Sequence, residues 1–533
     1  MPRYLLAALC AFGSISSSHA GDSLHDRIDG LIAAGHPNFA KQAAPLADDS
    51  EFLRRACLDL RGSIPTARET RAFLADPASD KREKLIDSLL AAPEYARRMT
   101  HHFDVLLNER RKDVKVLRAD WEKYLTHSFT ANRPFDLFVR EILSADGVDN
   151  EKRAPAKFFL DRDFEANIVT RDIARLFLGR NLQCAQCHDH PTITDYKQEH
   201  YFGIYAFLSR TFLFPKANLP TAVLAEKADG DTNFMSVFDK TKTQKTTTPK
   251  MPGGKPIAEP KAEKGKEYTI APTKPTVRPV PAFSRRALLA MTLTADRNFA
   301  RASVNRFWAF MMGRGLIHPL DLDHGENPPS HPELLDILTD EFIAHKYDVK
   351  WLIRELALTE TYQRSSVVPT GLETVPEDRY LVAALKPLSP EQMAYAIVQA
   401  SGQADADRTE AGAKAEGLTI RKTLPISAVF AGPAGEPEDS STATLDQTLF
   451  LKFGPVMRDM LAKRPNSLVD RLSKQKDARA VAEELFLSVL TRKPSAEEIT
   501  DVADALKAKG DPEAIHRELV WSLMASGEFR FNH

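Results

Sequence analysis

The stretch Gln183-Cys184-Ala185-Gln186-Cys187-His188-Asp189-His190-Pro191 concentrates the reactive side chains of this 533-residue chain. Two cysteines three positions apart, followed at once by a histidine, form the attachment pattern of c-type haem. The spacing suits that chemistry, because each thiol bonds one vinyl group of the same porphyrin and the imidazole reaches the iron from one face. The pattern therefore predicts a cofactor-binding site made of Cys184, Cys187 and His188, with His188 as the iron ligand.

The same stretch is open to two other interpretations. A zinc site can take Cys184 and Cys187 with His190 or His200, because His188 directly follows Cys187 and would struggle to point into the same tetrahedron. A disulfide between the two cysteines, in an oxidising compartment, is the third interpretation. If haem is bound, four residues are candidates for the distal iron ligand: Met235, His200, His101 and His102.

On both sides of this stretch the chain has the pattern of a mainly α protein. Apolar residues recur at helical spacing, and helix starts are marked by a capping residue three positions before an acid or amide. These capping signals are Thr66 with Glu69, Asp80 with Glu83, Ser330 with Glu333, Ser389 with Gln392, and Ser495 with Glu498. The sequence predicts two helical domains, 27–211 and 282–533, with a small β-containing insertion at 212–281.

The predicted insertion differs in composition from the helical parts. Residues 222–228 and 234–238 are predicted to form a hairpin around the polar turn 229–231. The following stretch, 240–274, is rich in Lys, Thr, Pro and Gly, and is predicted to be a weakly structured linker whose lysines are mostly a solvated surface. A second polar stretch, 403–447, is predicted to be a long surface loop.

Aromatic residues crowd the chain just after the cysteine motif. Rings at such a density can wall a flat apolar cofactor, or they can form the buried face of an ordinary core helix. The pattern alone leaves both interpretations open. The run consists of Tyr196, Tyr201, Phe202, Tyr205, Phe207, Phe212 and Phe214.

The N-terminus has the pattern of an export signal. Arg3 is followed by a short apolar run at 5–15 and by the small-residue site Ser18-His19-Ala20, which predicts a signal peptide at 1–20. We expect a periplasmic or extracellular protein without an integral membrane segment, because no later apolar run is long enough to cross a bilayer. The net charge of −1 gives no indication of nucleic acid as a partner. Of the three cysteines that remain after export, Cys57 is predicted to be a buried thiol.

A second polar constellation lies in the C-terminal half, around Pro328-Pro329. Carboxylates and imidazoles that converge in this way can form a hydrolase site. The simpler interpretation is a rigid loop that sets up the next helix, because no nucleophile is evident. The residues concerned are Asp321, Asp323, His324, Glu326, Asn327 and His331.

These motifs together resemble a large family of secreted bacterial proteins, best known from planctomycetes. Its members join a planctomycete cytochrome-like domain to a C-terminal planctomycete-specific domain, and both domains are of unknown function. The first domain is matched by the motifs at 52–62, 132–140 and 184–191. The second is matched by those at 283–287, 304–308, 313–316, 327–336 and 362–366.

The resemblance implies an exported protein with a cytochrome-like pattern, and no activity follows from it. Together with the residues, it favours a cytochrome-like protein that binds haem c for redox or electron transfer with an unidentified redox partner. The alternative is a non-haem protein: a metal-stabilised scaffold or binding protein, with zinc as the metal, or a hydrolase that acts on surface polymers.

Overall fold

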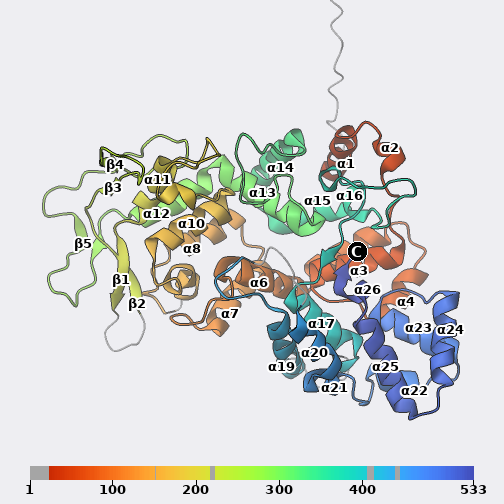
Figure 1. Cartoon of the computed structure of the whole chain (residues 1–533). Helices are drawn as coiled ribbons and strands as arrows, with labels where there is room; N and C mark the ends of the chain where they lie inside the picture. Colours follow the sequence, from red (N-terminus) through yellow and green to blue (C-terminus); the bar gives the residue numbers. More distant parts are fainter. Residues whose placement is uncertain (1–22, 151, 216–221, 405–412, 438–443) are drawn as a thin grey trace, which may run out of the picture.

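The described residues fold mainly into α-helices, and their strands occur only as short two-stranded pairs (Figure 1). The computed structural model describes residues 23–150, 152–215, 222–404, 413–437 and 444–533. The predicted fold class is confirmed, with small β elements between helical regions. The predicted signal peptide at 1–20 lies outside the described residues.

The chain before the cysteine motif is a run of helices. The capping box predicted at Thr66 and Glu69 is confirmed at the start of α4. Asp80 precedes α5 but does not cap it, because its carboxylate pairs with Lys84 instead. The elements are α1 Leu24–Ala34, α2 Phe39–Gln42, α3 Asp49–Ala56, the π-helical turn η1 Cys57–Arg61, α4 Ala67–Ala75, α5 Lys81–Ala91, α6 Pro93–Asn108, α7 Arg118–Thr130, α8 Phe135–Ser144, η2 Ala154–Ala156, α9 Lys157–Leu160 and α10 Ala166–Leu178.

The motif and the insertion follow, and the predicted hairpin pairing is wrong. Strand β2 pairs with β1, and β3 pairs with β4, so 222–228 and 234–238 are not partners. Strand β1 supplies an apolar partner for the buried strand β2 through Phe212, Leu213 and Phe214, whereas Phe234 of the predicted partner stacks on Phe202 of α11. The elements are η3 Cys184–Gln186, α11 Gln198–Leu208, β1 Thr211–Pro215, β2 Ala222–Glu226, β3 Thr232–Phe234, β4 Lys245–Thr247, β5 Tyr268–Ile270 and β6 Val280–Pro281.

The second half is again helical. The capping boxes predicted at Ser389 and Ser495 are confirmed. At α14 the predicted cap is wrong, because the helix begins at Pro332 with His331 at its N-cap position, and the hydroxyl of Ser330, one residue earlier, contacts Nδ1 of His331 instead. The elements are α12 Arg285–Ala295, α13 Arg297–Met312, α14 Pro332–Ala344, α15 Val349–Leu358, α16 Glu360–Gln363, η4 Glu377–Arg379, β7 Lys386–Pro387, α17 Pro390–Ala400, α19 Ala413–Phe430, α20 Leu445–Phe453, α21 Pro455–Met460, α22 Leu468–Ser473, α23 Ala478–Val489, α24 Ala496–Leu506, α25 Pro512–Met524, α26 Gly527–Arg530 and β8 Phe531–Asn532.

The stretch 403–447 is not the long surface loop that its composition predicted. Helix α19 lies within it, and α20 begins at its end. Pro425 lies inside α19. Because proline usually interrupts a helix, its presence made this stretch resemble a loop in the sequence.

Two hydrophobic clusters hold the described residues together. The first runs from Leu24 to Tyr380 and joins helices from both halves of the chain: the ring of Phe135 in α8 stacks on that of Phe299 in α13, with 5.8 Å between centroids. The second contains residues of the last helices, together with Leu58. In Figure 1 the helices from α17 onward gather at the opposite end of the molecule from β1–β5. The predicted domain limits stay a prediction.

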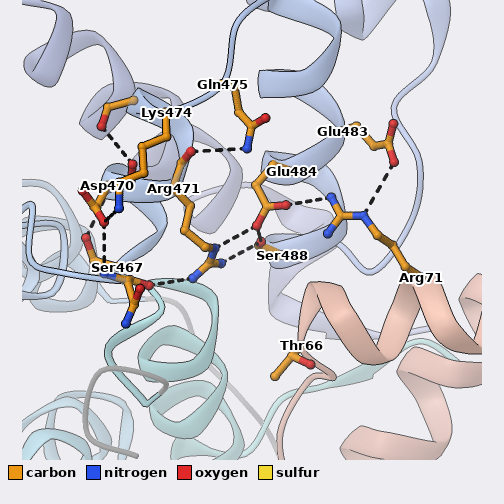
Figure 2. A network of polar contacts seen from close by, with 12 residues as sticks. Thr66, Arg71, Ser467, Asp470, Arg471, Lys474, Gln475, Glu483, Glu484 and Ser488 are labelled. Carbon is orange, nitrogen blue, oxygen red and sulfur yellow. Dashed lines mark hydrogen bonds and ion pairs between the residues drawn. The ribbon is translucent and has the colours of Figure 1, made fainter. Parts of the chain in front are cut away.

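Ion pairs fasten the N-terminal helix α4 to the C-terminal helices α22 and α23, as Figure 2 shows. The carboxylate of Glu484 accepts hydrogen bonds from Arg71 at 2.7 Å and from Arg471 at 2.8 Å. Glu484 is buried, whereas its neighbour Glu483 is half-buried and lies 3.7 Å from Arg71. Glu484 is therefore the residue of this network that both arginines share.

A second buried network joins distant parts of the chain at Asp59 in the turn η1. Its carboxylate accepts hydrogen bonds from Tyr362 at 2.9 Å, from Lys386 at 2.7 Å and from Asn532 at 2.8 Å. Lys386 also donates to the carbonyl of Met311 in α13, at 2.8 Å. Because Asp59 is only 2% exposed, all these groups depend on one another rather than on water.

Candidate functional site

The cysteine motif forms a short turn on the surface. The N–H of Cys187 bonds the carbonyl of Cys184 at 3.2 Å, and in a 3₁₀ turn residues three positions apart lie on the same side. Both cysteines are exposed free thiols, whereas Ala185 between them is fully buried. The turn is thus anchored through Ala185 and presents two thiols side by side to solvent.

The imidazole of His188 is oriented by a backbone carbonyl. Its Nδ1 lies 2.6 Å from the carbonyl oxygen of Asp189. Because a carbonyl only accepts, Nδ1 carries the proton, and the lone pair of Nε2 is left available. Metal-binding histidines are usually held in this way, with one ring nitrogen donating to a carbonyl and the other facing the metal.

An exposed apolar segment of the insertion lies beside the turn. The N–H of Val237 bonds the carbonyl of Cys187 at 3.0 Å, and the ring of Phe238 lies 4.7 Å from that of His188. The side chain of Gln198 in α11 donates to the carbonyl of Met235 at 3.1 Å. Met235, Val237 and Phe238 are 44%, 63% and 73% exposed. We call these three residues the apolar rim of the motif.

The two histidines of the zinc interpretation are held in different ways. Nδ1 of His190 accepts from the backbone N–H groups of Thr192 and Ile193, so its proton is on Nε2. Nδ1 of His200 lies 2.8 Å from the carbonyl of Asp195, which leaves its Nε2 available, and burial lowers its pKa. Within the described ranges no three His, Cys, Asp or Glu side chains are close enough together to hold a metal ion. The zinc interpretation therefore has no preformed ligand set in this part of the chain.

The candidate distal ligands fall into two groups. His101 and His102 lie in α6, where their rings pack against Tyr395 and Phe310 at 5.5 Å and 4.7 Å. Burial lowers the pKa of each to about 3, so both are neutral at neutral pH. Met235 is held against the motif through Gln198, which also donates to the carbonyl of Gln186. His200 is in α11, the helix that follows the motif.

The aromatic run after the motif contributes three rings to the core. Tyr196, Tyr201 and Phe207 are fully buried within the first hydrophobic cluster. Phe202 stacks on Phe234 of β3 with 4.6 Å between ring centroids, which fixes the insertion to α11. The packing supports the core interpretation for the three buried rings, whereas Phe202, Tyr205, Phe212 and Phe214 are partly exposed.

The polar loop at 321–331 lies against the chain segment that carries the motif. The N–H of Asn181 donates to the carbonyl of Asp321 at 2.7 Å, and the N–H of Asp323 donates to the carbonyl of Gly179 at 3.0 Å. Gly325 donates to the carboxylate of Asp195 at 2.6 Å. The two polar stretches, distant in sequence, are thus neighbours in space.

The side chains of this loop have separate partners and do not converge. Asp323 pairs with Arg301 at 3.3 Å, and Asn327 donates to a carbonyl of its own loop. His331 is only 5% exposed and packs against Gly35, where an added Cβ would lie 2.4 Å from its Nε2. Neither Nε2 of His331 nor Nδ1 of His324 has a hydrogen-bond partner among the described residues. A carboxylate–imidazole pair of the kind used in hydrolysis is not formed there.

None of the described helices has the length and the apolar character required to cross a membrane. Of the three residues of the apolar rim, the sequence indicated only Met235, as a candidate distal iron ligand. Three apolar residues in a polar stretch are a weak signal, and only the packing of the insertion on α11 brings them to the cysteines.

Two family models match the chain, and each describes a protein of unknown function. PSCyt2 (DUF1549) matches residues 27–212, and PSD1 (DUF1553) matches residues 285–424. No curated protein and no solved structure matches the chain. The chain therefore belongs to the family of proteins that join a PSCyt2 domain to a PSD1 domain, in that order.

Proposed function

We propose that this protein is an exported, cytochrome-like protein that binds c-type haem at Cys184, Cys187 and His188 and takes part in redox or electron transfer. The observation that carries the proposal is the surface turn, whose two exposed thiols lie on one side next to a histidine with an available Nε2. Haem, when bound, supplies one-electron chemistry, and the protein supplies attachment, orientation and shielding.

The residues present fit such a group in three respects. Cys184 and Cys187 lie on one turn, so both can reach vinyl groups of one porphyrin. His188 has its Nδ1 proton engaged by a carbonyl, which fixes the ring and raises the basicity of Nε2. Met235 of the apolar rim provides an exposed side chain on which a flat apolar ring can pack, and burial of this kind contributes to setting a haem potential.

Export is part of the same proposal. It is supported by the composition of residues 1–20, with Arg3 before a short apolar run and a small-residue cleavage site. Two exposed thiols so close together in an oxidising compartment would readily form a disulfide, and attachment to a porphyrin removes them from that reaction.

The proposal is tested by producing the full chain in a host that exports it and has the cytochrome c maturation machinery. We expect coloured protein with the absorption spectrum of c-type haem and one iron per chain. The colour should stay with the protein after denaturation and extraction with acidified acetone, because thioether bonds survive where coordination does not. Cys184→Ser with Cys187→Ser should give protein that loses its colour under the same treatment.

Two matched variants make the test specific. His190→Gln removes an imidazole two residues from His188 whose Nε2 carries the proton, and should leave the spectrum unchanged. His188→Gln should change the spectrum, because the proximal ligand is gone. Colourless wild-type protein from a host that matures a control cytochrome would overturn the proposal. Stoichiometric zinc in that protein would favour the metal-stabilised alternative, and an effect of Asp323→Asn on polymer cleavage would favour the hydrolase.

A further inference from the structure

The insertion next to the motif carries a group of exposed lysines. Residues 239–250 contain four lysines and one aspartate, although the whole chain has a net charge of −1. Lys240, Lys242 and Lys245 are exposed, and none of the three forms an ion pair within the described part of the chain. We call these three residues the basic patch. An excess of unpaired positive charge in one place attracts acidic partners and increases their rate of encounter.

The acid within this stretch does not neutralise the patch. The carboxylate of Asp239 accepts hydrogen bonds from the hydroxyl of Thr241 at 2.5 Å and from the backbone N–H groups of Thr241 at 2.9 Å and of Thr243 at 3.2 Å. These bonds lower the pKa of Asp239 and hold the loop that carries the lysines. Asp239 stays ionised and offsets one of the three charges of the basic patch, which leaves an excess of two positive charges to meet a partner.

The basic patch is fixed next to the motif. Val237 and Phe238, which contact Cys187 and His188, lie directly before Asp239 in the chain. Strand β4, which contains Lys245, is paired with β3, so that Lys245 lies opposite Phe234. Phe234 in turn stacks on Phe202 of α11. The apolar rim and the basic patch are therefore parts of one surface that is held against the helix following the motif.

We propose that this surface, the apolar rim with the basic patch beside it, is the docking site of an acidic protein. Transient protein interfaces commonly combine a small apolar centre with a charged rim, and charge complementarity steers their association. The rim is central to the choice of partner: Val237 and Phe238 would give a polyanion nothing to contact, but they suit an apolar spot on a protein. The docking site is inferred from the surface itself, and only the role of the partner in electron transfer rests on the proposed function.

The test uses flavodoxin, a small acidic electron-transfer protein, as the probe and the full chain as its partner. Binding is measured by biolayer interferometry at low and at high ionic strength, and haem content is measured on the same sample. We expect flavodoxin to bind at low ionic strength and to be released by salt, because the Debye length shortens to about 8 Å at physiological ionic strength. Reversing the patch with Lys240→Glu, Lys242→Glu and Lys245→Glu should weaken binding by about tenfold or more.

The matched control reverses three exposed lysines at the other end of the molecule. Lys476→Glu, Lys493→Glu and Lys509→Glu together change the net charge by the same amount and should leave binding within about twofold. A separate variant, Val237→Ser, should weaken binding about fivefold without changing its dependence on salt, because it removes apolar contact and no charge.

The outcomes separate this inference from the proposed function. Flavodoxin binding that depends on the basic patch, in protein that lacks haem, supports the docking site and contradicts the proposed function. Haem-loaded protein that does not bind flavodoxin, or that is weakened equally by both triple variants, overturns the docking site alone. Binding of heparin without binding of flavodoxin also overturns it, since the surface would then recognise a polyanion.

Discussion

Two clusters of reactive side chains in this molecule have opposite character. At Asp59 a carboxylate, a phenol, an ammonium group and an amide are buried together, and each is hydrogen-bonded to the carboxylate. At the Cys184 turn two thiols are exposed, and the neighbouring imidazole of His188 has an available nitrogen. A cluster whose donors all bind one buried carboxylate holds a fold together, whereas a cluster with available atoms at the surface can hold something else.

The comparison also shows why a concentration of polar residues does not by itself mark a site. Burial lowers the pKa of Lys386 and Asp59 opposes that shift, a combination that in a cleft would indicate catalysis. Here the ammonium group donates to Asp59 and to the carbonyl of Met311. The network is therefore structural. Substitutions of buried polar groups should reduce the stability of the fold more than substitutions in the exposed turn.

Replacing the central carboxylate should give the largest loss. Asp59→Ala leaves the ammonium group of Lys386 buried without its counter-charge, and we expect the free energy of unfolding to fall by about 3–5 kcal/mol. Urea denaturation followed by circular dichroism measures it. The control Asp501→Ala, on the exposed face of α24, should change the same quantity by no more than about 0.5 kcal/mol. A loss below about 1 kcal/mol for Asp59→Ala would show that the network is not cooperative.

Acid should destabilise the fold through the partly buried imidazoles of α6. The folded-state pKa of His101 and of His102 is about 3, below the value of about 6.5 expected in the unfolded chain. Protons therefore bind the unfolded chain first, and stability is lost as the pH falls below about 6.5. At pH 5.5 the loss should be about 1.4 kcal/mol for each histidine.

Denaturation in urea at pH 8 and at pH 5.5 measures this loss. The double variant His101→Gln, His102→Gln should be less sensitive to acid than the wild type by about 3 kcal/mol, whatever its stability at pH 8. Equal losses for the two proteins between these pH values would mean that the imidazoles bind protons as readily in the folded protein as in the unfolded chain.

The shared carboxylate of Figure 2 should matter more than its neighbour. Glu484→Gln weakens two ion pairs of a buried residue, and we expect a loss of about 2 kcal/mol in the free energy of unfolding. Glu483→Gln removes one partly exposed contact to the same Arg71 and should cost no more than about 0.5 kcal/mol. Similar losses for the two variants would contradict the assignment of Glu484 as the shared residue.

The exposed cysteines should contribute least to stability. Cys184→Ser and Cys187→Ser should each change the free energy of unfolding of haem-free protein by no more than about 0.5 kcal/mol, because both side chains are in water. Cys57→Ser places a hydroxyl at a position that is 1% exposed, and we expect it to cost about 1–3 kcal/mol. A large loss at Cys184 or Cys187 would indicate that the turn is a structural element.

The sequence predicts those features whose residues lie close together along the chain. The capping boxes at Thr66 and Ser495 were predictable because donor and acceptor lie three residues apart. The buried state of Cys57 followed from the apolar residues around it. The network at Asp59 was not predictable, because its partners Tyr362 and Asn532 are 303 and 473 residues away in sequence.

The candidate site likewise contains residues that the sequence predicts and residues that only the tertiary packing brings to it. Cys184, Cys187 and His188 could be identified because the motif is continuous, whereas Val237 and Phe238 join it only through the packing of β3 on α11. The pairing of β2 with β1 could not be chosen over the predicted hairpin, because both offered apolar partners at similar separation. The separate roles of Asp323 and His331 likewise depend on distant residues, Arg301 and Gly35.

The most direct test of the central claim, that the exposed turn exists to hold a porphyrin, is the intact mass of the exported protein after denaturation. We expect the wild type to carry the added mass of one haem, Cys57→Ser to carry the same addition, and Cys184→Ser with Cys187→Ser to carry none. A wild-type mass equal to that of the processed chain alone, from cells that attach haem to a control cytochrome, would contradict the account.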